Sequence, residues 1–383
     1  MVDWLENRWV VPAYSGWILL GISICFLAAA INTMVGWLYV LSGLSLALLA
    51  IASVLPQRSL SGISIRRRPI QPVSAGDQLT IELEISNQTT QPKTLFQVQD
   101  VLPYVLGQPL LAPIEILPPQ ASYNWVYNHS TQRRGIYRWQ MVHLRTATPL
   151  GLFWCRRQRD VPATAIVYPT VLPLTSCPIV DEIGQETSNQ FYSQQRFHAA
   201  TEGMTRSLRP YRQGDPTRLI HWRTSARYGE LRVRELEVVT GAQEIIIALD
   251  SAAWQEDNFE QAAIAAASLY FYSQRQQLNV KLWTALTGLI AGERTVLEAL
   301  AETESGQPNA SLPSNKPVIW LSQNPLSLSS LPTGSRSLLW SSASSPQPEI
   351  LVHRVPGLVI QTGQPLQLQL QSAVRRDGLF PLG

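Results

Sequence analysis

The densest polar chemistry in this sequence lies between Ser207 and Glu237. Arginines recur throughout the segment, as Arg209, Arg212, Arg218, Arg223, Arg227, Arg232 and Arg234. Tyr211, His221 and Trp222 are interleaved with them, and Gly214-Asp215-Pro216 is typical of a turn. Guanidinium groups bind carboxylates or phosphates through paired hydrogen bonds, and aromatic rings can stack on guanidinium groups or on nucleobases.

Two interpretations of this segment are compatible with its residues. As a surface, residues 207–237 would bind nucleic acid or another polyanion. As a structural joint between domains, its arginines would instead pair with nearby acids, namely Asp215, Glu230, Glu235 and Glu237. Arginine alternates with Leu231, Val233 and Leu236, as on a strand with one buried face, so the joint is favoured and Trp222 is expected to be buried.

A second candidate site follows the apolar run 244–249. Asp250 and Ser251 come directly after it, and a carboxylate with a hydroxyl at a strand end is suited to a divalent cation such as magnesium. The same residue types also cap helix N-termini, which is the favoured interpretation here. Phosphate-loop, zinc-protease and nucleophile-elbow motifs are absent from the sequence, so we expect a non-enzymatic protein. An enzyme built around Asp215, His221 and Asp250 is a weaker alternative.

Composition limits the class of protein. The chain has 383 residues, a net charge of +3 and 3 cysteines. This length suggests two or three domains, and so small a charge is not that of a dedicated nucleic-acid binder. The widely spaced Cys25, Cys155 and Cys177 indicate free thiols in a reducing compartment.

Two apolar runs near the N-terminus predict a transmembrane helical hairpin. They cover 10–31 and 34–55, and each has about the twenty residues that a helix needs to cross a bilayer. The flank after the second run is basic, with Arg58 and residues 66–68, whereas the turn between the runs is uncharged. The positive-inside rule therefore places both termini in the cytoplasm, with the two-pass hairpin in the inner (plasma) membrane.

The rest of the chain divides into a β-rich part and an α/β part. Alternating segments over 79–85, 94–98, 122–127, 136–144 and 163–168 predict an immunoglobulin-like β-sandwich. The polar segment 170–206 is expected to be a loop. Strand and helix patterns then alternate, with strands at 244–250, 279–286, 318–321, 337–340, 350–355 and 358–361 and helices at 256–276 and 294–301. The predicted boundaries are 1–60 for the hairpin, 61–170 for the sandwich, 171–240 for a linker with the arginine-rich segment, and 241–383 for the α/β domain.

The arginine-rich segment closely resembles the signature of the prokaryotic family called domain of unknown function 58. That signature reads Tyr-x-x-Gly-Asp-x-x-Arg-x-Ile-x-Trp-x-x-Ser-Ala-Arg, followed by a strand of the form Val-Arg/Lys-x-x-Glu. The matching positions are Tyr211, Gly214, Asp215, Arg218, Ile220, Trp222, Ser225, Ala226, Arg227, Val233, Arg234 and Glu237. Pro210 stands where the family often has an acid, and His221 where it often has Asp.

The resemblance also implies an architecture and a partner. Family members commonly have an N-terminal transmembrane pair, a Pro-Leu-Gly-Leu-Phe segment like 149–153, and a C-terminal von Willebrand factor A-like α/β domain. Factor A domains bind a cation through Asp-x-Ser-x-Ser, for which this chain has Asp250, Ala252 and Trp254, so two oxygen ligands are missing. Such proteins resemble partners of MoxR-type AAA+ ATPases, which implies a membrane-anchored adaptor or scaffold. Its cytoplasmic factor A-like domain is expected to bind the partner, a MoxR-type AAA+ ATPase.

Overall fold

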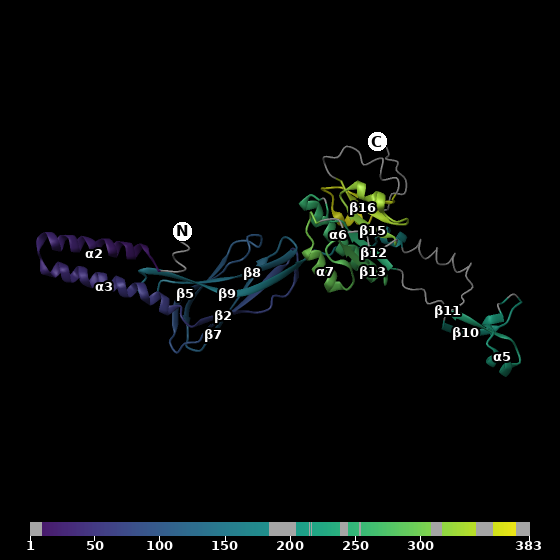
Figure 1. Cartoon of the computed structure of the whole chain (residues 1–383), viewed down its shortest axis with the longest axis horizontal. Coiled ribbons are helices and arrows are strands. Elements are labelled where there is room, and N and C mark those ends of the chain that lie inside the picture. Colours follow the sequence, from purple (N-terminus) through teal and green to yellow (C-terminus); the bar gives the residue numbers. More distant parts are fainter. Residues whose placement is uncertain are drawn as a thin grey trace. The chain divides into compact units, whose positions relative to one another are not determined.

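A computed structural model describes residues 10–183, 204–237 without Gly214 and Pro216, 244–307 without Ala253, 316–341 and 355–372. The chain forms two compact units, Met1–Tyr168 and Pro169–Gly383 (Figure 1). The first unit contains a helical hairpin and a β-sandwich. The second contains a parallel α/β sheet and a small module around the arginine-rich segment.

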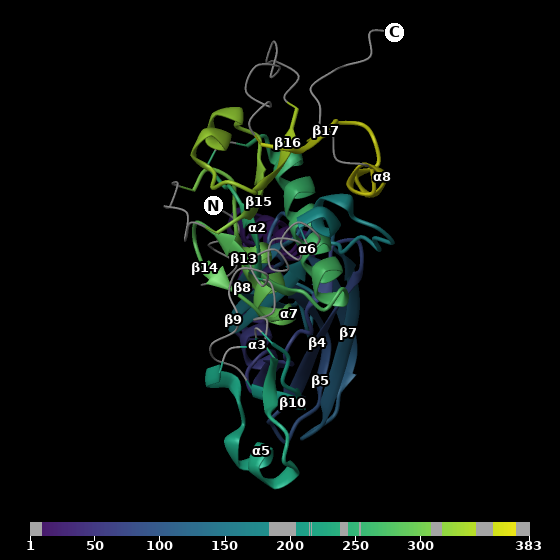
Figure 2. The same ribbon diagram turned by 90° about the vertical axis from the view of Figure 1, so that its right-hand side faces the viewer.

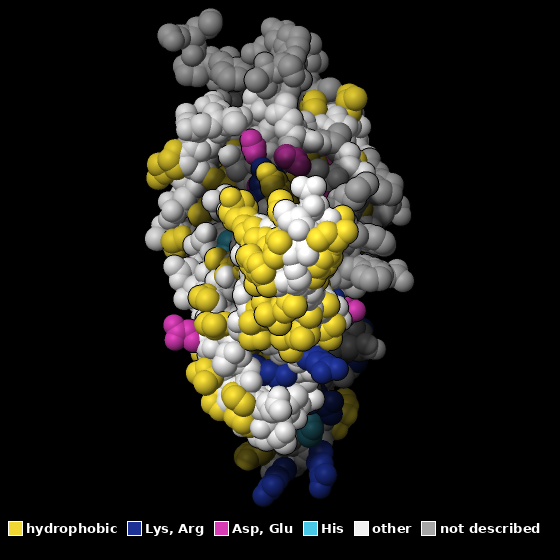
Figure 3. Space-filling view, turned by 90° about the vertical axis from the view of Figure 1, so that its left-hand side faces the viewer, with side chains coloured by type: hydrophobic (Ala, Val, Ile, Leu, Met, Phe, Trp, Pro, Cys, Tyr) yellow, Lys and Arg dark blue, Asp and Glu magenta, His cyan; other side chains and the backbone are white. Residues whose placement is uncertain are grey.

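The N-terminal hairpin consists of α2 (Tyr14–Thr33) and α3 (Gly36–Ser59), both long and apolar enough to cross a membrane. Met34 ends α2 in the left-handed conformation, and its N–H donates to the carbonyl of Ala30 at 2.9 Å. The Ser42 hydroxyl donates across to the backbone carbonyl of Ser23 at 3.1 Å, a contact typical of helix pairs in lipid. Apolar side chains cover the outer faces of the hairpin (Figure 3).

Both ends of the hairpin are fixed to the sandwich. β1 (Val11–Pro12) pairs with β9 (Phe153–Tyr168) immediately before α2 begins. The N–H of Ala13 then donates to the carbonyl of Leu152 at 2.8 Å, and the Ser15 hydroxyl donates to the carbonyl of Gly151 at 2.8 Å. After α3, Leu60 is buried in the sandwich core. The helices therefore leave the sandwich without a flexible linker.

Two sheets form the sandwich. The smaller sheet has the order β2-β4-β7, with β2 at Ile63–Arg67, β4 at Gln78–Asn87 and β7 at Ser122–Ser130. The larger sheet has the order β1-β9-β8-β5-β6, with β5 at Lys93–Asp100, β6 at Leu110–Leu117 and β8 at Gly135–Thr146; β3 (Val73–Ser74) pairs with β9. Inward side chains of both sheets share one core, which includes Leu83, Ile85, Phe96, Val98 and Leu144.

A buried ion pair crosses this core. The Arg67 guanidinium on β2 donates to both carboxylate oxygens of Asp100 on β5 at 2.8 Å, and their side chains are 2% and 0% exposed. Tyr127 on β7 donates to Asp100 at 2.7 Å and Trp139 on β8 donates to it at 3.1 Å. Burial raises the pKa of Tyr127, which therefore stays protonated as a donor. Asp100 thus binds donors from both sheets.

The expected strand segments are all strands in the structure, and β1, β2, β3 and β6 are additional ones. Pro113 lies inside β6, where a residue without an N–H argues against a strand. The ladder tolerates Pro113 because β6 is the edge of its sheet. β9 is also longer than the expected 163–168, since charged residues interrupt its apolar pattern.

The α/β sheet has the order β14-β13-β12-β15-β16-β17, in which β14 is antiparallel and the other strands are parallel. Its strands are β12 (Glu244–Leu249), β13 (Asn279–Thr284), β14 (Gly288–Ile290), β15 (Val318–Ser322), β16 (Arg336–Trp340) and β17 (Gly357–Ile360). Helices α6 (Glu256–Arg275), α7 (Glu293–Glu302) and α8 (Leu366–Leu370) share one core cluster with the sheet (Figure 2). The short helix η2 (Pro325–Ser330) packs in a second hydrophobic cluster, which lies on the opposite face of the same sheet. The expected strand at 350–355 lies almost wholly outside the described residues.

The expected loop over 170–206 is wrong for its first part. Leu174, Cys177, Ile179 and Val180 are buried in the same core as α6. The Tyr272 hydroxyl donates to the carboxylate of Asp181 at 2.9 Å, which fixes this segment to the helix. The apolar residues here are too few and too irregularly spaced to show a period in the sequence, so their burial is a tertiary effect.

We predict that Arg67→Met destabilises the chain by about 3–5 kcal/mol, because the Asp100 carboxylate would remain buried without its cation. Denaturant unfolding of the full chain in detergent micelles measures this loss. Arg66→Met is the matched control, since Arg66 is exposed on the same strand and its loss should cost less than about 0.5 kcal/mol. The double variant Arg67→Met with Asp100→Leu should recover most of the stability. Equal losses of stability in Arg67→Met and in the control Arg66→Met would contradict the role of the pair.

Candidate functional site

The arginine-rich segment forms a small module of its own, called here the signature module (residues 204–237). Its strands β10 (Met204–Pro210) and β11 (Arg232–Glu237) pair antiparallel, and η1 (Thr217–Leu219) and α5 (Trp222–Tyr228) lie between them in sequence. The N–H of Tyr211 donates to the carbonyl of Leu231 at 2.8 Å, which closes the hairpin end. Ile220 and Val233 form a bridge and are buried.

His221 and Ser225 hold α5 in place. The Nδ1 atom of His221 accepts a hydrogen bond from the N–H of Thr224 at 3.2 Å, so His221 is the N-cap of the helix. The Ser225 hydroxyl is buried and accepts the N–H of Arg232 at 2.9 Å, which joins α5 to β11. Gly229 ends the helix with φ of 71°. These signature residues therefore have structural roles.

Asp215 is held by an arginine that the motif does not include. Both guanidinium nitrogens of Arg209 donate to its carboxylate at 2.7 Å, and the N–H of Arg212 donates to it at 2.8 Å. These hydrogen bonds, from Arg209 first, lower the pKa of Asp215 to about 2. The expected pairing of arginines with acids is thus present at Asp215. Gly214 and Pro216 of the expected turn lie outside the described residues, as do the side chains of Glu235, Leu236 and Glu237.

The expectation that Trp222 is buried is wrong. Trp222 is 65% exposed, Tyr228 is 60% exposed and Leu231 is 45% exposed, whereas Val233 on the same strand is 2% exposed. Trp222 begins a short helix that contacts β11 through Ser225 and through Tyr228, whose ring lies 4.5 Å from the Arg232 guanidinium. Four arginines of the module are also exposed: Arg218, Arg223, Arg227 and Arg234. The module therefore presents cations and aromatic rings together.

A second candidate site lies at the carboxyl end of β12. β12 lies between β13 and β15, where the strand order reverses, and ligands of open α/β sheets bind outside such points. Asp250 and Ser251 follow β12 there and are 4% and 1% exposed. Ser322 ends the neighbouring strand β15, and its hydroxyl donates to Oδ2 of Asp250 at 2.7 Å. Sequence reasoning missed Ser322, although a polar residue ending a buried apolar strand is a usable signal.

Asp250 does not cap the following helix. Its Oδ1 accepts the N–H of Ala252 at 3.1 Å, while α6 begins at Glu256 with Gln255 in the cap position. The favoured N-cap interpretation is therefore wrong. Intervening residues form a turn in which the Trp254 indole N–H donates to the backbone carbonyl of Asp250. The sequence pattern could not show this turn, because capping residues and turn residues are the same types.

The residues around Asp250 do not fit a magnesium ion. The buried Ser251 hydroxyl has no hydrogen-bond partner among the described residues, which is a feature of some ligand sites. Ala252 and Trp254 supply no side-chain oxygen, and the Trp254 ring packs on Trp340 with centroids 5.3 Å apart. Within the described part of the chain, no group of three His, Cys, Asp or Glu residues is arranged to hold a metal. This donor set falls short of the octahedral oxygen shell that magnesium demands.

We predict a specific acid dependence for the signature module. Because the folded pKa of Asp215 is about 2 and the unfolded value is about 3.9, the Arg209 pair stabilises the module above pH ~4 and this stabilisation is lost as the pH falls toward ~2. Hydrogen exchange of the β10 and β11 amides measures it. Asp215→Asn should reduce protection equally from pH ~7 to ~5, and the difference from wild type should shrink below pH ~4. A difference that grows on acidification would contradict the assigned pair.

For the second site, we predict that Asp250→Ala destabilises the chain by about 1–3 kcal/mol, because the buried hydroxyl of Ser322 would lose its acceptor. Thermal unfolding of the full chain provides the measurement. Asp257→Asn is the control, since Asp257 is exposed in the first turn of α6 and its loss should cost less than about 1 kcal/mol. Equal effects of the two substitutions would show that Asp250 has no special structural role.

Comparisons with known proteins agree with the motif. Residues 207–310 match the family model described as protein of unknown function DUF58. An uncharacterized protein YeaD of Bacillus subtilis (strain 168) is 25% identical over 200 residues, which is 51% of this chain and 48% of that protein, so the alignment spans about half of each. Among solved structures, the CARDB domain of the PF1109 protein from Pyrococcus furiosus matches 27% of this chain and 93% of its own, with 12% identity and a TM-score of 0.19. A β-glucosidase from Listeria innocua matches 27% of this chain and 16% of its own, with 14% identity and a TM-score of 0.17. Over residues 207–310, this chain is therefore similar to the DUF58 family.

Proposed function

We propose that this chain is a non-enzymatic, membrane-anchored adaptor that binds a protein partner through its signature module. The observation that carries the proposal is the joint exposure of Trp222 and Tyr228 beside exposed arginines. Trp, Tyr and Arg are the residue types enriched at the energetic centres of protein interfaces. Because Trp222 is exposed and the fold of the module does not depend on its side chain, we infer that a partner covers it.

Anchoring in the membrane is the second part of the proposal. The exposed apolar faces of α2 and α3 would be unfavourable in water and are suited to lipid. Arg58, Arg66 and Arg68 flank the end of α3, so the positive-inside rule supports a two-pass topology with both termini and the sandwich in the cytoplasm of the inner membrane. The exposed module would then face cytoplasmic proteins.

A third part concerns the α/β unit and its partner. When β12 is numbered as strand 1, the strand order of the sheet is 3-2-1-4-5-6, and strand 3 (β14) is antiparallel to its neighbour. This order and the aspartate after the first strand support a von Willebrand factor A-like domain that has lost its cation ligands. The family resemblance then favours a MoxR-type AAA+ ATPase as the partner.

Affinity capture of the full chain from detergent-solubilised membranes, with a non-hydrolysable ATP analogue present, tests this function. We predict that wild-type chain recovers an AAA+ ATPase and that Trp222→Ala reduces recovery about 30-fold, the effect of losing an interface centre worth about 2 kcal/mol. Tyr104→Ala is the matched control, because Tyr104 is an aromatic residue 98% exposed on the sandwich. Both variants should unfold like wild type. Capture without any ATPase, or equal loss in the control, would contradict the proposal.

The exposure of Arg218, Arg223 and Arg227 favours one alternative, which is binding of nucleic acid or another polyanion by the same module. Polarisation with single-stranded DNA distinguishes it. The alternative requires affinity that falls steeply with salt, and a shallower salt dependence for Arg223→Ala with Arg227→Ala. Absence of salt-dependent binding would exclude it.

A further inference from the structure

The turn 147–152 joins β8 to β9 at the end of the sandwich from which the helices leave. It is fixed to the first turn of α2 by two hydrogen bonds. The Ser15 hydroxyl donates to the carbonyl of Gly151, and the N–H of Ala13 donates to the carbonyl of Leu152, both at 2.8 Å. The turn therefore lies at the level at which α2 begins.

The start of β5 is attached at the same level. Lys93 is buried there, and its Nζ donates to the carbonyl of Arg58 in the last turn of α3 at 3.3 Å. The Thr148 hydroxyl donates to the carbonyl of Thr94 at 3.1 Å, which joins the turn 147–152 to β5. The start of α2, the end of α3 and the first residues of β5 are thus held together around this turn.

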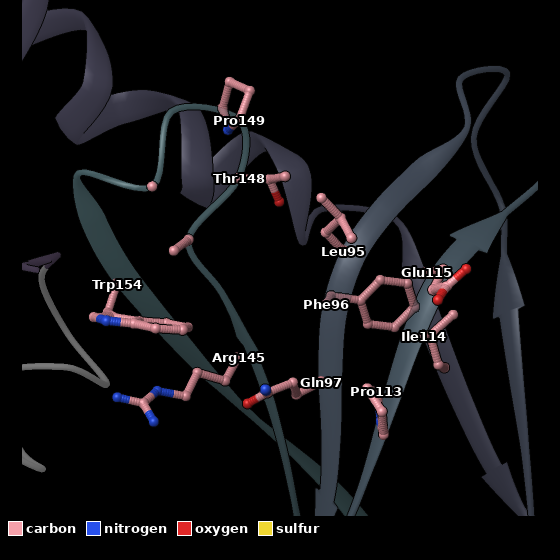
Figure 4. A pocket seen from close by; sticks show the side chains of 12 residues that line it. Leu95, Phe96, Gln97, Pro113, Ile114, Glu115, Arg145, Thr148, Pro149 and Trp154 are labelled. Atoms are coloured by element: carbon pink, nitrogen blue, oxygen red, sulfur yellow. The ribbon is translucent and has the colours of Figure 1, made fainter.

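Apolar side chains are exposed at this end of the sandwich. Leu150 is 44% exposed in the turn, and Leu95 is 65% exposed on β5. Pro149 is exposed as well, and it lines with Leu95 a cavity of about 310 Å³ between the turn and the sheet (Figure 4). Leu95, Pro149 and Leu150 are called here the apolar rim. Apolar groups gathered on a surface are a feature of sites that contact protein or membrane.

The backbone holds Leu95 in an unfavourable conformation. The ladder between β5 and β6 is formed on either side, at Thr94 and Phe96, but it is interrupted at Leu95, where φ is 49°. Leucine rarely adopts this left-handed conformation. The Leu95 carbonyl accepts the Thr146 hydroxyl at 2.9 Å, so neighbouring contacts maintain it. A strained backbone that presents an apolar side chain to the surface points to a function for that exposure.

We propose that the apolar rim inserts into the interfacial layer of the lipid bilayer and seats the sandwich on the membrane surface. The assignment rests on the proposed membrane anchoring, which places the start of α2 at the headgroups. Lipid is the favoured occupant because the hydrogen bonds of Ala13 and Ser15 make the rim continuous with the apolar outer face of α2. Tyr14 and Trp17 are exposed in the first turn of α2, and these residue types are enriched at that depth.

The proposal is tested on the full chain in phosphatidylcholine nanodiscs with a charged, membrane-impermeant thiol reagent. Leu150→Cys and Leu95→Cys are each made together with Cys25→Ala, so that only buried native thiols remain. We predict that both react about tenfold more slowly than Val105→Cys in the same background, because the rim must leave the lipid before the reagent reaches it.

Val105 is the matched control. It is an aliphatic residue, 63% exposed, and it follows Asp100 at the end of β5 opposite to Lys93 and the hairpin. Equal reaction rates for Leu150→Cys and Val105→Cys would overturn the lipid contact. Protection that disappears when each nanodisc holds a single chain would also overturn it, since that result would assign the rim to a second copy.

The native Cys25 tests the anchor separately, because it is exposed near the middle of α2. Rapid reaction of Cys25 in the wild-type chain would contradict membrane anchoring. Protection of Cys25 together with rapid reaction of Leu150→Cys would contradict the seating of the rim alone. Failure of the anchor and failure of the rim are therefore distinguishable.

Discussion

The pair formed by Arg67 and Asp100 is the interaction on which the N-terminal unit depends. Asp100 accepts hydrogen bonds from Arg67, Tyr127 and Trp139, so one carboxylate joins strands of both sheets. A well-packed apolar replacement could be equally stable, but a shift of β2 by one residue would turn Arg67 to the other face of its sheet. The Asp100 carboxylate would then be buried without its cation.

The sandwich also holds the hairpin. Leu60 lies in the sandwich core directly after α3, and the turn 147–152 contacts the start of α2. The hairpin is therefore oriented by the sandwich rather than attached to it by a flexible linker.

Residues of the signature module have two different roles. Asp215, His221 and Ser225 satisfy backbone and guanidinium groups locally and build the fold of the module. Trp222, Arg223 and Arg227 are exposed and contribute little to that fold. The site after β12 differs, because the buried Ser322 hydroxyl there donates a hydrogen bond to the carboxylate of Asp250 at the carboxyl ends of two central strands. Exposed chemistry is thus concentrated in the signature module.

The two apolar helices, the main strands of the sandwich and the alternation in the α/β unit can be predicted from the sequence, because they depend on hydrophobic periodicity within short windows. The motif between Tyr211 and Glu237 also indicated a resemblance to the DUF58 family, whose model matches residues 207–310. The tertiary structure alone decided that residues 172–183 enter the α/β core, that Trp222 is exposed and that Asp250 pairs with Ser322 instead of capping α6. The apolar rim likewise required the fold, since the packing of a turn against α2 and β5 brings together residues that no local pattern links.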